Sequence, residues 1–360
     1  MKIAFVTRSM SGGGVERVIS TLANGLSKDK NNFVSIITIG NSQCAYELDK
    51  RINLKTVTTK VNVCGFRGIA RVINLRNVLT KDNYDVVISF SANTNVFAIA
   101  ACRLCCKIPI IVSERNDPNN DPSSSHMRKI RNIMYNFTDA IVFQTNDARD
   151  YFKKSISRKG VVIYNPLKVN LPDVYEGERE NVITCAARLE AQKNLTMLIK
   201  AFSSFDKSYP DYKLYIYGEG SEREKLEQQV KSYGLENKVF LPGNVPDVTQ
   251  RITKSKMFAL SSDYEGLSNA MLEALAIGLP VVSTDHPIGG AKLFIRNGEN
   301  GYLIKCNDAN GMAEAFEKIA RNTIDYGHLS EQAILLREEL SIEKISKCWI
   351  DLIIKVAKKR

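Results

Sequence analysis

The chain has 360 residues, of which 44% are hydrophobic and 25% charged, the usual mixture of a soluble globular protein. This length predicts two domains, and the composition excludes a disordered, collagenous or repeat-only chain. Lysine and arginine number 50 against 39 acidic residues, and the net charge of +11 favours polyanionic partners: nucleic acid, an anionic membrane surface or phosphate-bearing substrates. No apolar run approaches the ~18 residues of a membrane-spanning helix, and the eight cysteines are too scattered for a disulfide framework. Because the apolar start is also too short for a signal peptide, we expect a cytoplasmic protein.

The first half of the chain alternates short apolar runs with helical patterns. The predicted strands are residues 2–7, 33–39, 85–90, 108–112 and 140–143. This alternation predicts βαβ units and therefore a parallel sheet. A polar stretch that begins at Tyr164-Asn165-Pro166 is the best domain boundary.

A glycine-rich turn, Ser11-Gly12-Gly13-Gly14, follows the first strand. Such a turn lets backbone N–H groups approach a phosphate at the start of the next helix. The spacing is not G-x-G-x-x-G, and no acidic residue follows the second strand, which argues against a nicotinamide dinucleotide site here. A tight turn that needs glycine for its geometry alone stays an alternative.

The same alternation restarts after the boundary. The predicted strands are 182–186, 213–217, 239–241, 257–260 and 281–283, and the predicted helices are 195–205, 222–233 and 268–277. The fold class is therefore α/β, with two doubly wound halves that face a central cleft and bind ligands at strand carboxyl ends. We place the domains at 1–166 and 167–341, followed by a basic amphipathic helix, 342–360, that can cross back to the first domain.

The densest signal combines two carboxylates with two cations. Glu265 follows a strand, and Glu273 lies eight residues further on, inside a helix whose first N–H groups come from 266–268. Arg188 and Lys193 follow the first strand of the second half, where two cations can neutralise a diphosphate. Taken singly, each is explained as a solvated surface charge or as an acid favoured by a helix dipole. Together they indicate a nucleotide-sugar site.

These residues resemble the family 4 glycosyltransferases of the GT-B fold over nearly the whole chain. The matching motifs are Gly13-Gly14-Val15-Glu16-Arg17, Ala187-Arg188-Leu189, Gln192-Lys193-Asn194, Tyr217-Gly218-Glu219-Gly220, Leu241-Pro242-Gly243-Asn244-Val245 and the E-x7-E pair Glu265 and Glu273. The resemblance implies two Rossmann-like domains and a retaining transfer from a nucleotide sugar, usually without a metal. No Asp-x-Asp occurs in the sequence, which agrees with the last point.

The resemblance also implies a role for each matching residue. The donor-binding residues would be Gly13, Gly14, Arg188, Lys193, Gly243, Asn244, Val245, Glu265, Gly266, Leu267, Ser268 and Glu273. Among them, Arg188 and Lys193 would hold the diphosphate. Glu273 would bind the ribose and Glu265 the transferred sugar. Since negative charge grows on the diphosphate as the glycosidic bond breaks, Arg188, Lys193 and Glu265 are also catalytic candidates.

Two positions depart from the family pattern. Many members carry a histidine after the fourth strand of the first domain, where this chain has Glu114 and Asn116, and its three histidines lie elsewhere. Glu114 is therefore the remaining catalytic candidate. A glutamate often follows the glycines after a later strand, where this chain has Lys292 after Gly289-Gly290. The identity of the donor sugar is consequently open.

Two basic amphipathic stretches in the first half are candidates for acceptor or membrane contact. The first carries Arg67, Arg71 and Lys81 on one face, opposite Phe66, Ile69, Val72, Ile73 and Leu79. The second sets Arg128, Lys129 and Arg131 against Met127, Ile130, Met134 and Phe137. Such helices can lie on an anionic membrane or meet a lipid diphosphate, or their apolar faces can pack on the sheet and leave the cations solvated.

The sequence thus predicts a metal-independent, retaining hexosyltransferase without a cofactor beyond its nucleotide sugar. Its donor would be a UDP-sugar of a hexose or N-acetylhexosamine, and its acceptor a polyprenyl-diphosphate-linked glycan of bacterial capsule, O-antigen or related synthesis. We expect it on the inner face of the cell membrane, with no nucleic-acid partner. The alternatives are a nucleotide-sugar epimerase of similar fold, and a basic peripheral membrane or nucleic-acid-binding protein without activity.

Overall fold

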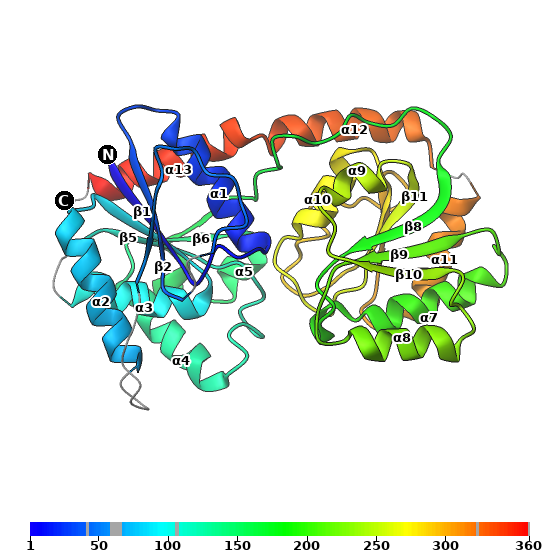
Figure 1. The fold of residues 1–360 in the computed structure, drawn as a ribbon, viewed down its shortest axis with the longest axis horizontal. Helices are drawn as coiled ribbons and strands as arrows, with labels where there is room; N and C mark the ends of the chain where they lie inside the picture. Colours follow the sequence, from blue (N-terminus) through cyan, green and yellow to red (C-terminus); the bar gives the residue numbers. More distant parts are fainter. Residues whose placement is uncertain (41–42, 58–66, 105–107, 322–323, 359–360) are drawn as a thin grey trace. The chain divides into compact units, whose positions relative to one another are not determined.

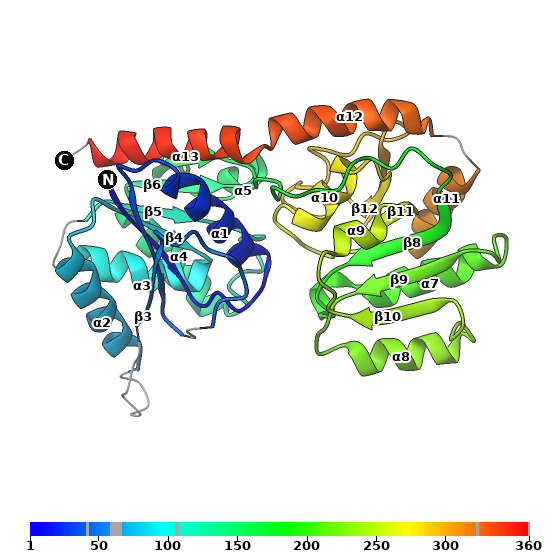
Figure 2. The same ribbon diagram turned by 45° about the horizontal axis from the view of Figure 1, so that its top comes forward.

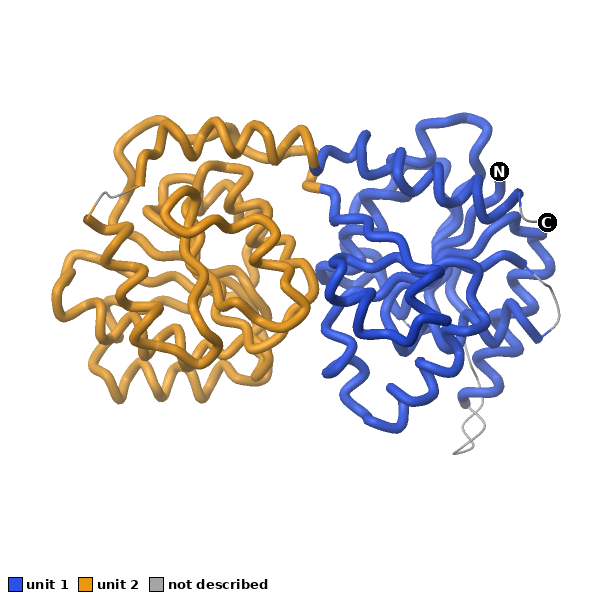
Figure 3. Tube along the Cα trace, turned by 180° about the vertical axis from the view of Figure 1, so that it is seen from behind, with its two compact units in different colours: residues 1–166, 340–360 blue, residues 167–339 orange. Residues whose placement is uncertain are grey.

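The computed structural model describes residues 1–40, 43–57, 67–104, 108–321 and 324–358. The chain divides into two compact units (Figure 3). Unit 1 comprises residues 1–166 and 340–360, and unit 2 comprises residues 167–339. Each unit is a parallel sheet with helices on both faces (Figures 1 and 2), which confirms the predicted α/β class with two doubly wound halves.

The described residues of unit 1 contain one sheet of seven parallel strands, in the order β3-β2-β1-β4-β5-β6-β7. The strands are β1 (Lys2–Thr7), β2 (Phe33–Thr38), β3 (Asn53–Thr56), β4 (Val86–Phe90), β5 (Ile110–Ser113), β6 (Ala140–Phe143) and β7 (Gly160–Val162). The central strands β4, β5 and β6 are buried along their whole length, as expected of β-branched runs covered on both faces.

Helices cover both faces of this sheet. They are α1 (Gly14–Ser27), α2 (Arg67–Asp82), α3 (Ala92–Arg103), α4 (Ser125–Met134), η1 (Tyr135–Phe137), α5 (Asn146–Asp150), α6 (Lys154–Ser157) and α13 (Ile342–Ala357). Helices α2, α3 and α4 pack in a row, whereas α13 packs against α1, β4 and β5. Trp349 of α13 is buried and stacks on Phe90 with ring centroids 5.6 Å apart. The last helix is thus part of the core of unit 1.

The described residues of unit 2 contain one sheet of six parallel strands, in the order β10-β9-β8-β11-β12-β13. The strands are β8 (Glu180–Ala186), β9 (Lys213–Tyr217), β10 (Val239–Gly243), β11 (Ser255–Leu260), β12 (Val281–Thr284) and β13 (Gly301–Ile304). The helices are η2 (Ala191–Lys193), α7 (Leu195–Asp206), α8 (Arg223–Ser232), α9 (Val248–Ile252), α10 (Asn269–Ala276), α11 (Ala309–Ala320) and α12 (Tyr326–Glu339). In Figure 2, α7 and α8 lie on one side of this sheet and α9, α10 and α12 on the other.

The strand order determines where a ligand can be bound in unit 2. Strand β8 lies between β9 and β11. After β8 the chain adds β9 and β10 on one side of this strand, and then β11, β12 and β13 on its other side. In open parallel sheets, ligands bind beyond the carboxyl ends of the strands at such a switch point. The loops after β8, β11 and β12 therefore meet at one edge.

Within the described part of the chain, no helix combines the length and the apolar character needed to cross a bilayer.

Candidate active site

The loop after β8 carries the predicted diphosphate-binding cations, and two glycines of the next loop give it room. A Cβ atom on Gly218 would lie 1.9 Å from the carbonyl oxygen of Ala187, and one on Gly220 would lie 2.3 Å from the carbonyl oxygen of Leu189. Leu189 is buried and anchors the loop, whereas the neighbouring Arg188 is exposed to solvent. The Tyr-Gly-Glu-Gly motif is therefore needed for close backbone packing beside the first cation.

The second cation, Lys193, forms an ion pair with Glu265 of the loop after β11. The Nζ atom of Lys193 donates a hydrogen bond to Oε2 of Glu265, and the hydroxyl of Ser262 donates to the same oxygen at 3.1 Å. Burial alone would raise the pKa of Glu265, but the nearby Lys193 ammonium and these hydrogen bonds hold it below its ordinary value. Since the two side chains are 10% and 17% exposed, a ligand from solvent can reach the pair.

Hydrogen bonds fasten the β8 loop to the β11 loop. The hydroxyl of Ser261 donates to the carbonyl oxygen of Lys193 at 2.7 Å, and the N–H of Asp263 donates to the carbonyl oxygen of Gln192 at 3.0 Å. The side-chain amide of Gln192 in turn donates to the carbonyl oxygen of Tyr264 at 2.7 Å. Lys193 and Glu265 are thus held together by the backbone as well as by their charges.

The second acid of the E-x7-E pair lies in α10. Ser268 caps this helix by accepting a hydrogen bond from the N–H of Met271 at 3.4 Å, and Glu273 follows one turn later with 2% of its surface exposed. Gly266 is buried, and a Cβ atom on Gly290 would lie 2.1 Å from its carbonyl oxygen. Glu265 and Glu273 therefore flank the start of a capped helix, as their spacing predicts.

Residues 243–245 begin at the end of β10, two strands from β8. Gly243 has φ +82°, and its carbonyl oxygen accepts a hydrogen bond from the N–H of Gly218 at 2.9 Å. Asn244 is exposed and Val245 is half-buried. The structure thus connects this segment to the glycine motif beside Arg188, at the same edge of the sheet as the two cations.

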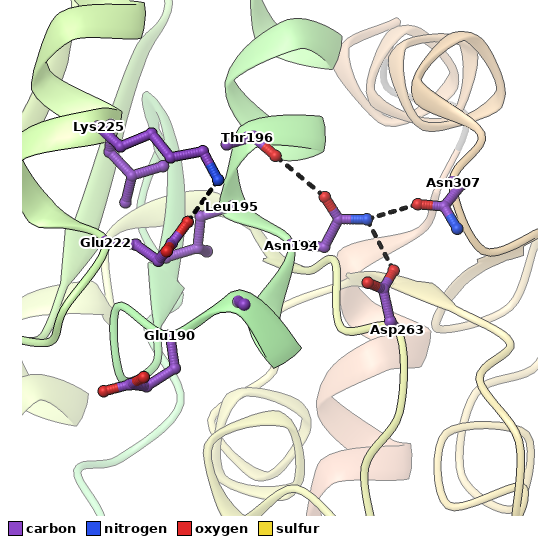
Figure 4. A pocket seen from close by; sticks show the side chains of 10 residues that line it. Glu190, Asn194, Leu195, Thr196, Glu222, Lys225, Asp263 and Asn307 are labelled. Atoms are coloured by element: carbon purple, nitrogen blue, oxygen red, sulfur yellow. Dashed lines mark hydrogen bonds and ion pairs between the residues drawn. The ribbon is translucent and has the colours of Figure 1, made fainter. Parts of the chain in front are cut away.

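A polar pocket lies beside the loop that holds Lys193 (Figure 4). Figure 4 shows Asn194 at its side, where the amide nitrogen donates to a carboxylate oxygen of Asp263 and to the amide oxygen of Asn307, both at 2.7 Å. Across the pocket, Lys225 donates to Glu222 at 2.6 Å. Because these groups bind one another, we assign them a structural role: their hydrogen bonds hold the loop in place.

In unit 1, the glycine turn occupies the start of α1, as predicted. The N–H of Gly13 donates to the hydroxyl of Tyr46 at 2.8 Å, and that hydroxyl donates to the carbonyl oxygen of Gly13 at 2.6 Å. Gly12 has φ +122°, so glycine is needed there for the backbone conformation as well. A phosphate that bound the Gly13 amide would have to displace Tyr46.

Glu114 follows β5 but points into the interior of unit 1. The hydroxyl of Tyr135 donates to its Oε2 at 2.5 Å, and Nη1 of Arg131 lies 3.8 Å from its Oε1, with both charged side chains fully buried. Asn95 donates to the Tyr135 hydroxyl at 2.8 Å. Burial raises the pKa of Glu114 to about 7 against the opposing effect of Arg131. Tyr135 and Arg131 thus hold the Glu114 side chain inside unit 1, and its catalytic role stays a prediction.

Comparison with known proteins identifies the family. The family descriptions Glycosyltransferase Family 4 and Glycosyl transferases group 1 match residues 12–171 and 171–335. The GalNAc-alpha-(1->4)-GalNAc-alpha-(1->3)-diNAcBac-PP-undecaprenol alpha-1,4-N-acetyl-D-galactosaminyltransferase of Campylobacter jejuni is 30% identical over 364 residues, which cover 99% of each chain. The chain belongs to the family 4 glycosyltransferases.

Two further proteins are similar to this glycosyltransferase. The N-acetylgalactosamine-N,N'-diacetylbacillosaminyl-diphospho-undecaprenol 4-alpha-N-acetylgalactosaminyltransferase of the same organism is 25% identical over 334 residues, 88% of this chain and 89% of its own. The crystal structure of Anabaena Alr3699/HepE in complex with UDP and glucose superimposes with a TM-score of 0.83 at 19% identity, over 98% and 99% of the two chains. This likeness shows that the glycosyltransferase has the GT-B fold.

In the first basic helix of the glycosyltransferase, α2, the buried face is not the apolar face that the sequence pattern predicts. Its inner face contains Leu75 and Leu79, both completely buried, together with half-buried Arg71. Ile69 and Ile73 belong to the face predicted either to contact a membrane or to pack on the sheet, and they are 58% and 47% exposed. The predicted basic face was thus wrong for Arg71, because the side of the helix with the leucines packs on α3.

The remaining residues predicted for that helix divide between exposed and undescribed positions. Lys81 is exposed, as expected of a cation available for contact. Phe66 and the side chain of Arg67 lie outside the described residues.

The second basic helix, α4, keeps only part of its predicted cationic face. Arg131 is completely buried, and its guanidinium donates to the carbonyl oxygens of Pro118 and Asp121. The expectation that it contacts an acceptor or membrane is therefore wrong. Arg128 is half-buried and donates to backbone carbonyls of the preceding loop, whereas Lys129 is exposed.

Sequence reasoning missed one titratable neighbour of the ion pair. His286 is 2% exposed and interacts electrostatically with both Glu265 and Lys193. It follows a predicted strand by three residues, which places it at the same sheet edge as the two charges. That position was the signal that could have identified it.

Proposed function

We propose that this glycosyltransferase transfers a hexose or N-acetylhexosamine from a UDP-sugar, with retention of configuration and without a metal, to a polyprenyl-diphosphate-linked glycan. The observation that carries the proposal is the solvent-accessible Lys193–Glu265 pair, with Glu273 eight residues further on in α10. A cation and two acids at one strand edge supply groups for a phosphate and for the hydroxyls on either side of it.

In this proposal, the donor diphosphate binds Lys193 and Arg188. Lys193 exchanges Glu265 for a phosphate oxygen, and exposed Arg188 supplies a second cation. When the glycosidic bond breaks, the electron pair goes to the diphosphate, whose negative charge grows. Cations that already occupy the site stabilise this charge without rearrangement, which lowers the barrier.

The two acids bind sugars on opposite sides of the diphosphate. Glu273 accepts hydrogen bonds from both hydroxyls of the ribose, since an ionised carboxylate is an acceptor only. Glu265, released by Lys193, accepts hydrogen bonds from the sugar that is transferred.

Retention follows if the acceptor hydroxyl attacks from the side on which the diphosphate leaves. The departing diphosphate oxygen then takes the proton of that hydroxyl, so no protein base is needed on the opposite face. The anomeric configuration of the product, measured by proton NMR at early times, tests this part: an inverted product would contradict it.

A panel of nucleotides tests the donor. We expect UDP and one or two UDP-hexoses or UDP-N-acetylhexosamines to raise the unfolding temperature of the wild-type protein. The double variant Arg188→Ala/Lys193→Ala should lose the response, whereas Lys231→Ala, an exposed lysine on α8, should keep it. A wild-type protein that responds to none of these nucleotides would contradict the UDP donor.

The acceptor is proposed from the two Campylobacter jejuni relatives, whose names specify undecaprenol-linked sugars. UDP release should require a polyprenyl-diphosphate-linked glycan and should be negligible with the free glycan. Conversion of a UDP-sugar to its epimer without any acceptor would instead identify an epimerase.

Membrane contact is proposed through exposed apolar side chains on the α2–α3–α4 face of unit 1. These side chains are 47–63% exposed and comprise Ile69, Ile73, Leu104, Ile133 and Phe137. Large exposed apolar groups beside lysines favour an anionic bilayer surface. The protein should sediment with vesicles that contain phosphatidylglycerol, and Ile133→Asp/Phe137→Asp should weaken this. Ile334→Asp, equally exposed on α12 of unit 2, is the matched control. Wild-type protein that stays in the supernatant would contradict the proposal.

A further inference from the structure

His286 lies near enough to the ion pair of the proposed donor site to interact with it electrostatically. It follows β12, the neighbour of β11 in the sheet, and its ring is almost completely buried. Both Glu265 and Lys193 interact with it electrostatically. Three adjacent strands, β8, β11 and β12, thus contribute one ionisable side chain each to the same place.

The hydrogen bond of Nδ1 determines the tautomer of this histidine. Nδ1 lies 3.1 Å from the carbonyl oxygen of Pro287, and a carbonyl oxygen can only accept. Nδ1 therefore carries the proton, and in the neutral ring Nε2 is an acceptor with a lone pair.

Burial of the ring keeps it neutral. Burial lowers the pKa of His286, and the Lys193 ammonium acts in the same direction. The carboxylates of Glu265 and Asp285 and the Pro287 carbonyl act in the opposite direction without reversing the shift. At neutral pH the ring thus presents an uncharged acceptor toward its surroundings.

Nε2 is buried, and none of the described residues donates a hydrogen bond to it. Buried polar atoms without a partner are rare because they destabilise a fold, and their occurrence at a binding site indicates a missing ligand group. The nearby charged groups do not donate to Nε2 either, because Lys193 and Glu265 are hydrogen-bonded to each other.

The backbone around the histidine has little freedom to move the ring elsewhere. A Cβ atom on Gly290 would lie 2.1 Å from the carbonyl oxygen of Gly266, so the two loops touch through their backbones. The hydroxyl of Thr284 donates to the carbonyl oxygen of Ser262 at 2.6 Å. Ile288 has φ +73°, a conformation that a β-branched residue keeps only when its surroundings enforce it.

We propose that Nε2 of His286 accepts a hydrogen bond from a hydroxyl group of the transferred sugar and thereby selects the donor. The inference rests on the proposed function, in which Lys193 leaves Glu265 for the diphosphate and the sugar takes its place beside Glu265. A sugar that lacks this hydroxyl, or carries it in the other configuration, leaves a buried acceptor unpaired. Sites that bind a hydroxyl in this way reject such analogues strongly.

Two substitutions of His286 distinguish the role of the Nε2 acceptor from that of the rest of the ring. In His286→Asn the side-chain amide keeps the position of Nδ1 but places nothing at Nε2, whereas in His286→Gln an amide oxygen reaches the position of Nε2. The probes are UDP, the UDP-sugar preferred by the wild-type protein, and its 3-, 4- and 6-deoxy analogues, each titrated by calorimetry. His328→Asn, which removes an exposed histidine, is the control.

We expect H286N to bind UDP within twofold of wild type and the preferred UDP-sugar about tenfold to a hundredfold more weakly. H286Q should recover most of this loss. One deoxy analogue should bind wild type as weakly as the full sugar binds H286N, and H286N should not distinguish the two, because the same hydrogen bond is missing in both cases.

Two outcomes overturn the proposal. If H286N binds the UDP-sugar as well as wild type does, Nε2 receives no hydrogen bond from the sugar. If H286N weakens UDP and UDP-sugar equally, the ring only supports the loop. In both cases a wild-type protein that binds the UDP-sugar leaves the proposed function intact, whereas a wild-type protein that binds neither probe overturns both proposals.

Discussion

Each unit holds a carboxylate and a cation just beyond the strands of its sheet, and the two pairs differ in their access to solvent. In unit 1, Glu114 and Arg131 are 3.8 Å apart and fully buried, and burial raises the pKa of the carboxyl group to about 7. In unit 2, Lys193 and Glu265 remain 10% and 17% exposed, and the ammonium offsets the effect of burial so that the pKa of Glu265 is lowered.

The difference separates a structural pair from a pair that can exchange partners. Arg131 also donates to backbone carbonyls of its own unit, so its guanidinium is bound within the interior of unit 1. In the proposed function, Lys193 leaves Glu265 for an incoming anion, which reaches the pair from its solvent-exposed side. Substitutions in the two pairs should therefore affect different measurements, stability in one case and donor binding in the other.

The largest effect is expected from Arg131→Met in the enclosed pair. Removing one partner of a buried pair costs about 3–5 kcal/mol of unfolding free energy, because the other charge stays buried without compensation. Urea unfolding should show this loss, while UDP affinity at 10 °C stays within twofold of wild type. A stable Arg131→Met variant with impaired UDP binding would contradict the structural role of the enclosed pair.

Lys193→Ala should impair the reaction rather than the fold. Loss of a group that stabilises transition-state charge lowers kcat by about 100- to 1000-fold. Steady-state UDP release measures this, with Lys231→Ala as the exposed-lysine control. Turnover within a few-fold of wild type would exclude a catalytic role for the open pair.

The pH dependence of stability should carry opposite signs at the two acids. The pKa of Glu114 is raised from 4.5 to about 7, so the folded protein binds this proton more tightly than the unfolded chain. Its contribution is full below pH 4.5 and is lost as the pH rises through about 7, a change of about 3 kcal/mol. Glu114→Gln should flatten this fall in urea unfolding between pH 5 and 8.

Glu265 supplies the internal comparison for that series. Its lowered pKa gives a contribution that is present at neutral pH and is lost as the pH falls through the folded-state value. Glu265→Gln should therefore leave the fall between pH 5 and 8 as it is in wild type. An unchanged slope in Glu114→Gln would mean that the carboxyl group is not held as the structure indicates.

The smallest effects should distinguish the two acids of the E-x7-E pair from each other. In the proposed function each accepts hydrogen bonds as a carboxylate, worth about 1.5–3 kcal/mol, or roughly tenfold to a hundredfold. Glu273→Ala should appear mainly as weaker UDP binding, and Glu265→Ala mainly as lower turnover. Equal and negligible effects on both quantities would contradict the two assignments.

The fold was predictable because its central strands are β-branched runs buried on both faces. Strands β3, β7 and β13 were not predicted, because they are three or four residues long and lack a fully buried pattern. Short edge strands carry little of the periodicity on which such predictions depend. They add to sheets whose order is already determined by the longer strands.

The site in unit 2 was predictable for a related reason. Lys193 and Glu265 each follow a central strand, and parallel strands bring such positions to one edge regardless of their separation in sequence. Unit 1 was less predictable because a charged residue gives no sign of its burial. Arg131 and Glu114 look like surface groups in the sequence, and only the packing of Tyr135 and Phe152 around them shows otherwise.

The helical patterns illustrate a third limit. The periodicity of α2 correctly indicates an amphipathic helix, but apolar residues occur on two sides of it. The side with Leu75 and Leu79 packs inward, which leaves Ile69 and Ile73 outside. Tertiary contacts with α3 determine which side of α2 is buried, and they involve residues outside the helix itself.

The insertion of Trp349 beside Phe90 has a consequence for biosynthesis. The ribosome makes α13 after the whole of unit 2, although this helix belongs to the core of unit 1. The first half therefore emerges with an apolar face uncovered, and unit 2 can complete its own core earlier. We expect the half translated first to reach its native state last, so a released chain that ends at residue 339 should be protease-resistant in unit 2 but cleavable in unit 1.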